Sequence, residues 1–483
     1  MIFSMRTAIR CAGGLFFSSA LLLHAEPPAP WPQFRGPNAT GIAAPDARPP
    51  VEFDSQKNCL WKVEVPPGGS SPVIWGGRVF LTGFASGKLE TLCIQCSDGT
   101  LLWKREAKAE AIEPFFDKFG TPAGPSCATD GEHVVTYFGS CGLVCHDFEG
   151  KELWSVPMPV IRSADGFGTG NSPVIFEGLV YLLRDEQGDA GGLYAFNVKT
   201  GKEVWHTSRK EFQVSYCTPV VWDGALVCIG ELRAKAYDLK TGRERWWARG
   251  LSAYPCTTAA AGPDGNLYIA TWSSGSGNEP NPEYDELLVR HDGDKSGDIS
   301  LVELADSPLR DFLGIMDDNQ NNVLERWEWD PIQSYMRTGK NAVLCIKPGG
   351  LGDVTDSHVV WQNERGASYV SSPLAYEDRL FLAKDGGFAT CYEAHSGKLL
   401  YEKQRLGAEG DYYASPVFAA GKIYAASSRG TVVVLDAAAD KLTVLARNVL
   451  GELLLATPAI VGNAIYVRTG SHLRAFTDKT SLP

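Results

Sequence analysis

Oxygen-bearing side chains recur between residues 292 and 303 at the spacing that a calcium ion requires. They stand at positions 1, 3, 5, 9 and 12 of this twelve-residue segment, with glycine at position 6 and an apolar residue at position 8. Ca²⁺ takes about six to eight hard oxygen ligands in a flexible geometry, and a loop of this pattern supplies them. We expect Asp298 to bind through its carbonyl, Ser300 through a water and Glu303 through both carboxylate oxygens. The remaining expected ligands are the side chains of Asp292, Asp294 and Ser296.

A second segment repeats this pattern 25 residues later. Its candidate ligands are Asp317, Asn319, Asn321, Val323, Glu325 and Glu328. Asn322 stands where the first loop has Gly297, and asparagine is among the residues that best tolerate a left-handed backbone after glycine. Two of the ligands are neutral amides, so we expect weaker binding here. The alternative is an acidic, solvated segment without an ion, since residues 283–330 hold 14 acidic and four basic side chains.

Both loops lie in a stretch with helical patterning, in contrast to the rest of the chain. Short helices are predicted at residues 283–290, 301–305, 309–316 and 326–336. Outside this stretch, a small residue is followed two places on by a polar residue, four further by glycine and four further by tryptophan. The clearest copies run from Ala195 to Trp205 and from Ala236 to Trp246. Self-similarity at about 40 to 50 residues indicates stacked supersecondary units.

Each unit also begins alike, most often with Ser or Thr followed by Pro, and contains four predicted short strands. Such units begin near residues 71, 124, 171, 217, 257, 371, 414 and 456. The last unit has three strands, and residues 58–65, which contain Trp61, supply the missing fourth. We therefore predict an all-β fold, an eight-bladed β-propeller of four-stranded antiparallel blades closed by joining the two chain ends, with a small helical insertion.

Cysteine occupies the small-residue position of several repeats. The residues concerned are Cys93, Cys145, Cys345 and Cys391. We expect these side chains to pack in the core because alanine fills the same position elsewhere. The alternative for Cys93 and Cys96 is a redox or metal pair.

The repeat resembles the tryptophan-docking motif of the pyrroloquinoline quinone (PQQ) enzymes, and with the entry segment at residues 31–37 it looks most like the exported PQQ-like propellers. The two acidic loops resemble an EF-hand pair. Because they lie inside a propeller blade, the resemblance implies that these loops stabilise the local structure. The resulting organisation is a signal peptide (1–25), an extended segment (26–57), the first propeller part (58–275), the EF-hand insertion (276–339) and the second propeller part (340–478).

The resemblance allows two functions. PQQ-dependent dehydrogenases commonly add an adjacent Cys-Cys pair and calcium ligands in the channel, and this sequence has no Cys-Cys pair. We therefore expect a non-catalytic binding or scaffold protein that binds calcium, with an alcohol or sugar dehydrogenase containing PQQ as the alternative. Aromatic residues shortly before the inner strands are candidates for a binding funnel for a protein or glycan, or for packing between blades. They are Phe167, Tyr216, Tyr254, Tyr369, Tyr412 and Tyr413.

The N-terminus and the charge indicate a location and exclude one class of partner. Residues 1–25 combine two arginines, an apolar run of about 13 residues and a small-residue end, as in a secretory signal peptide. We expect an exported, periplasmic or extracellular monomer without a membrane span after signal removal. The formal net charge of -12 argues against nucleic-acid binding.

Overall fold

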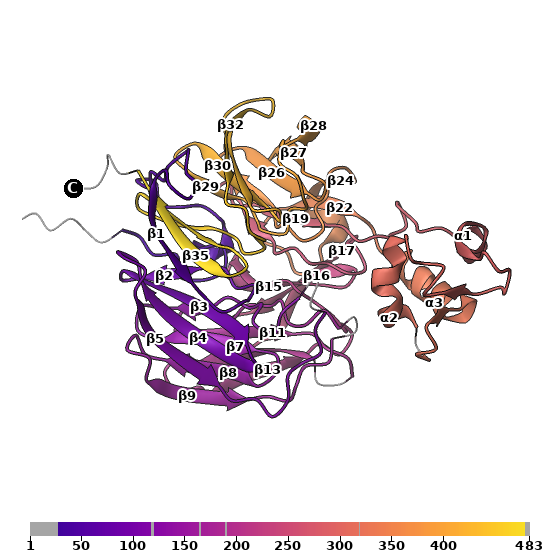
Figure 1. Ribbon diagram of the computed structural model, residues 1–483, viewed down its shortest axis with the longest axis horizontal. Helices are drawn as coiled ribbons and strands as arrows, with labels where there is room; N and C mark the ends of the chain where they lie inside the picture. The colour runs from indigo at the N-terminus through magenta and orange to yellow at the C-terminus, as the bar shows by residue number, and fades with distance from the viewer. Residues whose placement is uncertain (1–27, 117–119, 164–165, 189–190, 318, 479–483) are drawn as a thin grey trace, which may run out of the picture.

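The computed structural model describes residues 28–478 apart from 117–119, 164–165, 189–190 and 318. The predicted signal peptide lies outside the described residues. Eight four-stranded antiparallel blades form a ring, which confirms the predicted β-propeller (Figure 1). In the part of the chain that is described, no helix is long and apolar enough to cross a bilayer.

The blades follow the chain order. The first blade consists of β2 (Val73–Trp75), β3 (Arg78–Ala85), β4 (Lys88–Gln95) and β5 (Leu101–Ala107), and the second of β6 (Ala128–Thr129), β7 (Val134–Phe138), β8 (Gly142–His146) and β9 (Glu152–Pro157). The third blade consists of β10 (Val174–Phe176), β11 (Leu179–Arg184), β12 (Gly192–Asn197) and β13 (Glu203–Ser208). The fourth consists of β14 (Val220–Trp222), β15 (Ala225–Gly230), β16 (Arg233–Asp238) and β17 (Glu244–Arg249).

The fifth blade consists of β18 (Ala260–Ala261), β19 (Leu267–Thr271), β22 (Ala342–Ile346) and β24 (Val359–Asn363). The sixth consists of β25 (Leu374–Tyr376), β26 (Arg379–Lys384), β27 (Phe388–Glu393) and β28 (Leu399–Arg405). The seventh consists of β29 (Val417–Ala419), β30 (Lys422–Ser427), β31 (Thr431–Asp436) and β32 (Val444–Val449). The short β23 (Gly352–Asp353) pairs in parallel with β17 and precedes α4 (Thr355–His358).

The eighth blade joins the two ends of the chain. It consists of β33 (Ala459–Val461), β34 (Ala464–Arg468), β35 (His472–Thr477) and the N-terminal β1 (Cys59–Glu64). Trp61 lies opposite Ala475 in the ladder, and Figure 1 shows the indigo β1 beside the yellow β35. This confirms the predicted closure, which leaves the ring without a gap between its first and last blades.

The tryptophan repeat is a docking contact between neighbouring blades. Trp103 donates its Nε1–H to the carbonyl of Phe148 in the next blade (2.8 Å), and Trp61, Trp154, Trp205 and Trp361 make equivalent bonds. A Cβ on Gly150 would lie 2.6 Å from the Trp103 ring, so the repeat glycine gives the ring room. The small repeat residue lies directly opposite the tryptophan, as in the pair Cys93 and Trp103.

A ring of hydrogen bonds links the beginnings of all eight blades. At each link the backbone N–H of the Ser or Thr that precedes an inner strand donates to the hydroxyl of its counterpart in the next blade, at 2.9–3.2 Å. The links run from Ser71 to Ser126, Ser172, Thr218, Thr258, Ser372, Ser415 and Thr457 in turn, and from Thr457 back to Ser71. The recurrent Ser/Thr-Pro beginning therefore closes the ring around its axis.

The segment before β1 crosses one end of this ring. Trp31 pairs with Ile74 of the first blade, and the buried Arg35 donates to the carbonyl of Pro373 in the sixth. After η1 (Pro37–Ala39), Ala43 donates to Phe418 in the seventh blade (2.9 Å). These partners lie in, or directly before, the first strands of their blades, so the segment connects the first strands of separate blades.

The insertion lies between β19 and β22 of the fifth blade and stands to one side of the strands (Figure 1). It contains α1 (Tyr284–His291), β20 (Ile299–Ser300), η2 (Pro308–Phe312), α2 (Leu313–Met316), β21 (Val323–Leu324) and α3 (Arg326–Met336). The helix predicted at residues 301–305 is wrong, because these residues form successive turns. A span of about one turn has little helical preference of its own, so its surroundings decide its conformation.

Candidate functional site

The first acidic loop is organised by hydrogen bonds from its own backbone. Asp292 Oδ2 accepts from the backbone N–H of Gly297 (3.0 Å), whose φ is +91°. Glu303 accepts from the N–H of Gly293 with Oε1 and of Ser300 with Oε2, both at 2.8 Å. The bonds from Ser300 contribute most to lowering the pKa of Glu303. The carboxylate therefore stays charged and points towards the loop.

Carboxylates from both ends of this loop converge. One oxygen from each of Asp292, Asp294 and Glu303 lies within 4.8 Å of the other two. Ser296 shares the site, since its N–H donates to Asp292 and Asp294 and its hydroxyl donates to Asp298 Oδ1 (2.8 Å). Such a set of hard oxygens at one point could hold a divalent cation.

The second loop has the same backbone arrangement. Asp317 Oδ2 accepts from the N–H of Asn322 (2.7 Å), as Asp292 does from Gly297, and the φ of Asn322 is +63°. Glu328 Oε2 accepts from the N–H of Glu325 (2.9 Å). The amide nitrogens of Asn319 and Asn321 donate to Glu325 Oε2, while their oxygens accept from the backbone N–H groups of Asn321 and Val323. All six predicted positions thus lie in one loop.

The two loops are held together by a short antiparallel pair and a separate apolar core. Ile299 in β20 lies opposite Leu324 in β21, and each is the eighth residue of its loop. The hydroxyl of Tyr284 in α1 donates to the carbonyl of Leu324 (2.7 Å). The core consists of Tyr284, Leu287, Ile299, Leu304, Leu313, Met316, Leu324 and Trp329. Displacing either loop would therefore disturb the other.

Aromatic contacts connect the insertion to the propeller, as do contacts of its stem, the residues directly after β19 that lead into the insertion. The ring of Phe312 lies 6.4 Å from that of Phe167, and the ring of Tyr335 lies 6.1 Å from that of Tyr254. Tyr335 also donates to Glu231 Oε1 (2.8 Å) in the fourth blade. Trp272, directly after β19, contacts Tyr369 at 5.6 Å. Three of the six predicted funnel residues therefore contact the insertion or its stem.

The other three predicted funnel residues contact the propeller. The Tyr216 hydroxyl lies 3.2 Å from that of Ser163, and Tyr413 donates to Asp411 Oδ2 at 3.4 Å. Tyr412 is buried with the apolar residues of the sixth and seventh blades. Its packing is that of a core residue, whereas Tyr216 and Tyr413 are half-buried.

The repeat cysteines are core residues, as predicted. Cys93, Cys145, Cys345 and Cys391 are fully buried. Burial raises the pKa of Cys93 to about 12 and that of Cys96 to about 11, which keeps both thiols protonated at neutral pH. A protonated, buried thiol is a poor nucleophile and a poor metal ligand.

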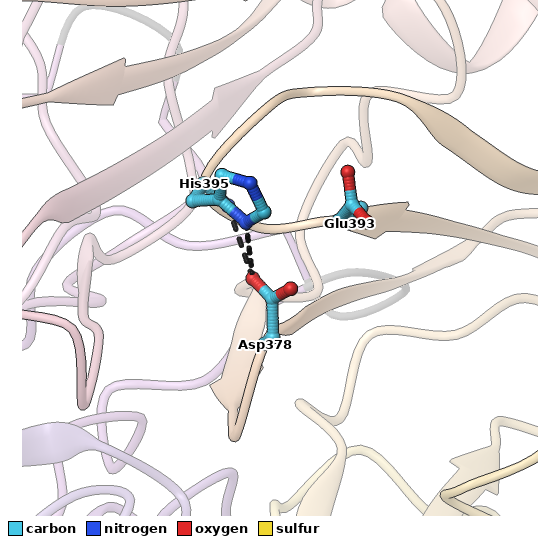
Figure 2. A group of neighbouring side chains, drawn as sticks. All are labelled: Asp378, Glu393 and His395. Atoms are coloured by element: carbon cyan, nitrogen blue, oxygen red, sulfur yellow. Dashed lines mark hydrogen bonds and ion pairs between the residues drawn. The ribbon is translucent and has the colours of Figure 1, made fainter.

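The structure also brings together Asp378, Glu393 and His395, which the sequence analysis did not connect (Figure 2). Glu393 occupies the polar position of the repeat, and His395 follows it by two residues. Asp378 lies in a different hairpin of the same blade, so the strand register was needed to bring it alongside. A comparison of turn residues between repeats would have shown that this blade is unusual.

The fold and the repeat define a PQQ-like β-propeller. The chain belongs to the family described as outer membrane protein assembly factor BamB, whose model matches residues 52–271 and 334–478. The unmatched residues between these parts contain both acidic loops. No curated protein matches the chain significantly by sequence.

Solved structures show the same fold at low sequence identity. BamB from Moraxella catarrhalis is 12% identical, with a TM-score of 0.55 over 88% of this chain and 98% of that one. The quinohemoprotein alcohol dehydrogenase from Comamonas testosteroni is 11% identical, with a TM-score of 0.54 over 94% and 82%. The computationally designed Ika8 protein is also similar, at 11% identity and a TM-score of 0.55 over 87% and 99%. Because these three proteins are of such different kinds, the shared fold alone does not indicate a function.

Proposed function

We propose that this protein is an exported, periplasmic or extracellular calcium-binding propeller that acts as a non-catalytic binding or scaffold protein. The observation that carries the calcium assignment is the repetition of one loop geometry, with matching carboxylate positions and a β20–β21 pair between the loops. This arrangement fits an EF-hand pair. Bound calcium would neutralise part of the acidic charge and stabilise the insertion.

The scaffold role is supported by the family and by the propeller itself. The family is described as an assembly factor. The Ser and Thr hydroxyls at the beginnings of the blades accept from backbone N–H groups of neighbouring blades. Their use in these bonds favours a structural role for this part of the ring. The half-buried aromatic side chains Tyr216 and Tyr413 lie at the end where the insertion attaches, and there they would contact a protein or glycan partner.

Calorimetry on chelator-treated, desalted protein tests the calcium sites. We expect two equivalents of Ca²⁺ to bind, and Glu303→Gln to remove the tighter one because it neutralises the ligand that closes the loop. Asp306→Asn is the matched control, since Asp306 is exposed in the same insertion and stands outside both ligand sets. An unchanged stoichiometry in Glu303→Gln would refute the first site.

The alternative, a PQQ-dependent alcohol or sugar dehydrogenase, rests on the similarity to quinoprotein folds. Mixing calcium-loaded protein with PQQ should give neither a bound-quinone spectrum nor dye-linked oxidation of alcohols or sugars. Stoichiometric quinone uptake with turnover would overturn the non-catalytic assignment.

A photo-reactive residue in place of Tyr216 or Tyr413 tests the binding face. In the native envelope fraction, both variants should cross-link to the same partner. The same residue at Asp98, in a hairpin at the opposite end of the blades, should give no such product. Equal cross-linking from all three positions would contradict a specific binding face.

A further inference from the structure

The sixth blade carries a group of metal-ligating side chains far along the chain from the acidic loops. Asp378 lies in the turn between β25 and β26, Glu393 ends β27, and His395 lies in the turn that follows. The Nδ1 atom of His395 is 2.9 Å from Asp378 Oδ1, and one ligand atom from each of the three side chains lies within 4.8 Å of the others. Figure 2 shows His395 bonded to Asp378, with Glu393 to one side of this pair.

The corresponding turn positions of the third and fourth blades carry residues that do not offer a metal ligand. Where the sixth blade has Asp378, the third and fourth blades have Gly178 and Gly224. Where it has His395, those blades have Lys199 and Lys240. The hairpin frame is the same, so the frame itself does not require ligand-type side chains at these positions.

The carboxylate of Glu393 is also used differently from its counterparts. Asn197 accepts from the backbone N–H groups of Lys199 and Thr200, and Asp238 accepts from those of Lys240 and Thr241. These shorter side chains cap their own turns. Like its counterparts, Glu393 accepts from the hydroxyl three residues on, here that of Ser396, but among the described contacts its carboxylate accepts no backbone N–H of the turn. Its longer side chain can exchange that single bond for a metal ion.

We propose that Asp378, Glu393 and His395 form a binding site for a divalent transition-metal ion of the Zn²⁺ type. One imidazole nitrogen with two carboxylates suits Zn²⁺, whereas Ca²⁺ prefers oxygen ligands alone. Ligand atoms around a tetrahedral Zn²⁺ are about 3.3 Å apart for bonds of about 2.05 Å, so small side-chain rotations complete the site.

The site is separate from the calcium loops and open to solvent. The insertion lies in the connection between second and third strands, whereas Asp378 and His395 lie in turns at the opposite end of an antiparallel blade. The side chains of His395 and Asp378 are 62% and 56% exposed. With three protein ligands, the ion keeps a position for water or for a ligand from another molecule.

Calorimetry with Zn²⁺ on the full chain, with Ca²⁺ present in saturating amounts, tests the site. The protein should bind one equivalent that is lost or at least tenfold weaker in His395→Lys and Asp378→Asn. His395→Lys introduces the residue found in the third and fourth blades, so its melting temperature should not change. His358→Lys, which replaces a half-buried histidine outside the group, is the matched control and should bind normally.

Co²⁺ absorption identifies the ligands independently. The expected spectrum is that of nitrogen and oxygen ligands, without the thiolate charge-transfer band that cysteine binding produces. Absence of Zn²⁺ binding, unchanged binding in His395→Lys, or a thiolate band that persists in that variant would overturn the proposal.

Discussion

At the level of single residues, the two acidic loops differ most at their sixth position. Gly297 and Asn322 both have positive φ, at +91° and +63°. Glycine adopts this conformation without steric cost, whereas asparagine retains a Cβ that crowds the backbone. The second loop therefore forms the same turn under more strain than the first.

Asn322→Gly should strengthen calcium binding to the second loop. Removing the strain is worth about 1 kcal/mol, which corresponds to about a fivefold change in affinity. Calorimetry should show the change in the weaker of two binding steps, with the tighter step unaffected. Tighter binding in the first step alone would show that the assignment of the two affinities is reversed.

At the level of the strands, each blade is fixed to the next by its tryptophan. Trp103→Phe removes the bond to Phe148 and part of the ring that covers Gly150. We expect the free energy of unfolding, measured with urea, to fall by about 1–3 kcal/mol. Trp327→Phe is the control because Trp327 is exposed in α3, and it should change the value by no more than about 0.5 kcal/mol.

The strands of the eighth blade are tied together by Glu452. Its carboxylate contacts Lys62 of β1 and His472 and Arg474 of β35. Burial alone would raise the pKa of Glu452, but hydrogen bonds from Thr469, His472 and Lys62 and the charge of Arg474 lower it well below its usual range. The carboxylate therefore joins strands from the two ends of the chain.

A lowered pKa has a defined consequence for acid stability. The stabilisation by Glu452 is present above the unfolded-state pKa of about 4.3 and is lost as pH falls towards the lower folded-state value. Glu452→Gln should cost about 1–2 kcal/mol at pH 7, and the difference from wild type should shrink below about pH 4. Urea unfolding at pH 7 and pH 3.5 measures both values. A constant difference would contradict the ionic contribution.

At the level of the whole molecule, one closed ring of hydrogen bonds to hydroxyl groups links all eight blades. Ser71 accepts from the backbone N–H of the buried Thr457 and so completes the ring. Ser71→Ala leaves that N–H without its acceptor, and the expected loss in unfolding free energy is about 1–3 kcal/mol. Ser97→Ala, at an exposed turn of the same blade, is the control. Equal effects would show that the closing link is unimportant.

The sequence by itself determined the eight repeats, the closure through Trp61 and the two acidic loops, because each depends on spacing within a short segment. Repeat spacing reflects strand length and turn geometry, which are local. The loop ligands likewise fall within twelve consecutive residues.

Only the tertiary structure decided which side chains from separate hairpins meet. Asp378 and His395 are 17 residues apart, and their contact depends on the register of β26 against β27. Tyr412 and Tyr413 are adjacent in the chain, yet the packing of the sixth blade against the seventh buries the first and leaves the second half-buried. The turns at residues 301–305 also depended on packing, because a span of one helical turn has too little local preference to fix its own conformation.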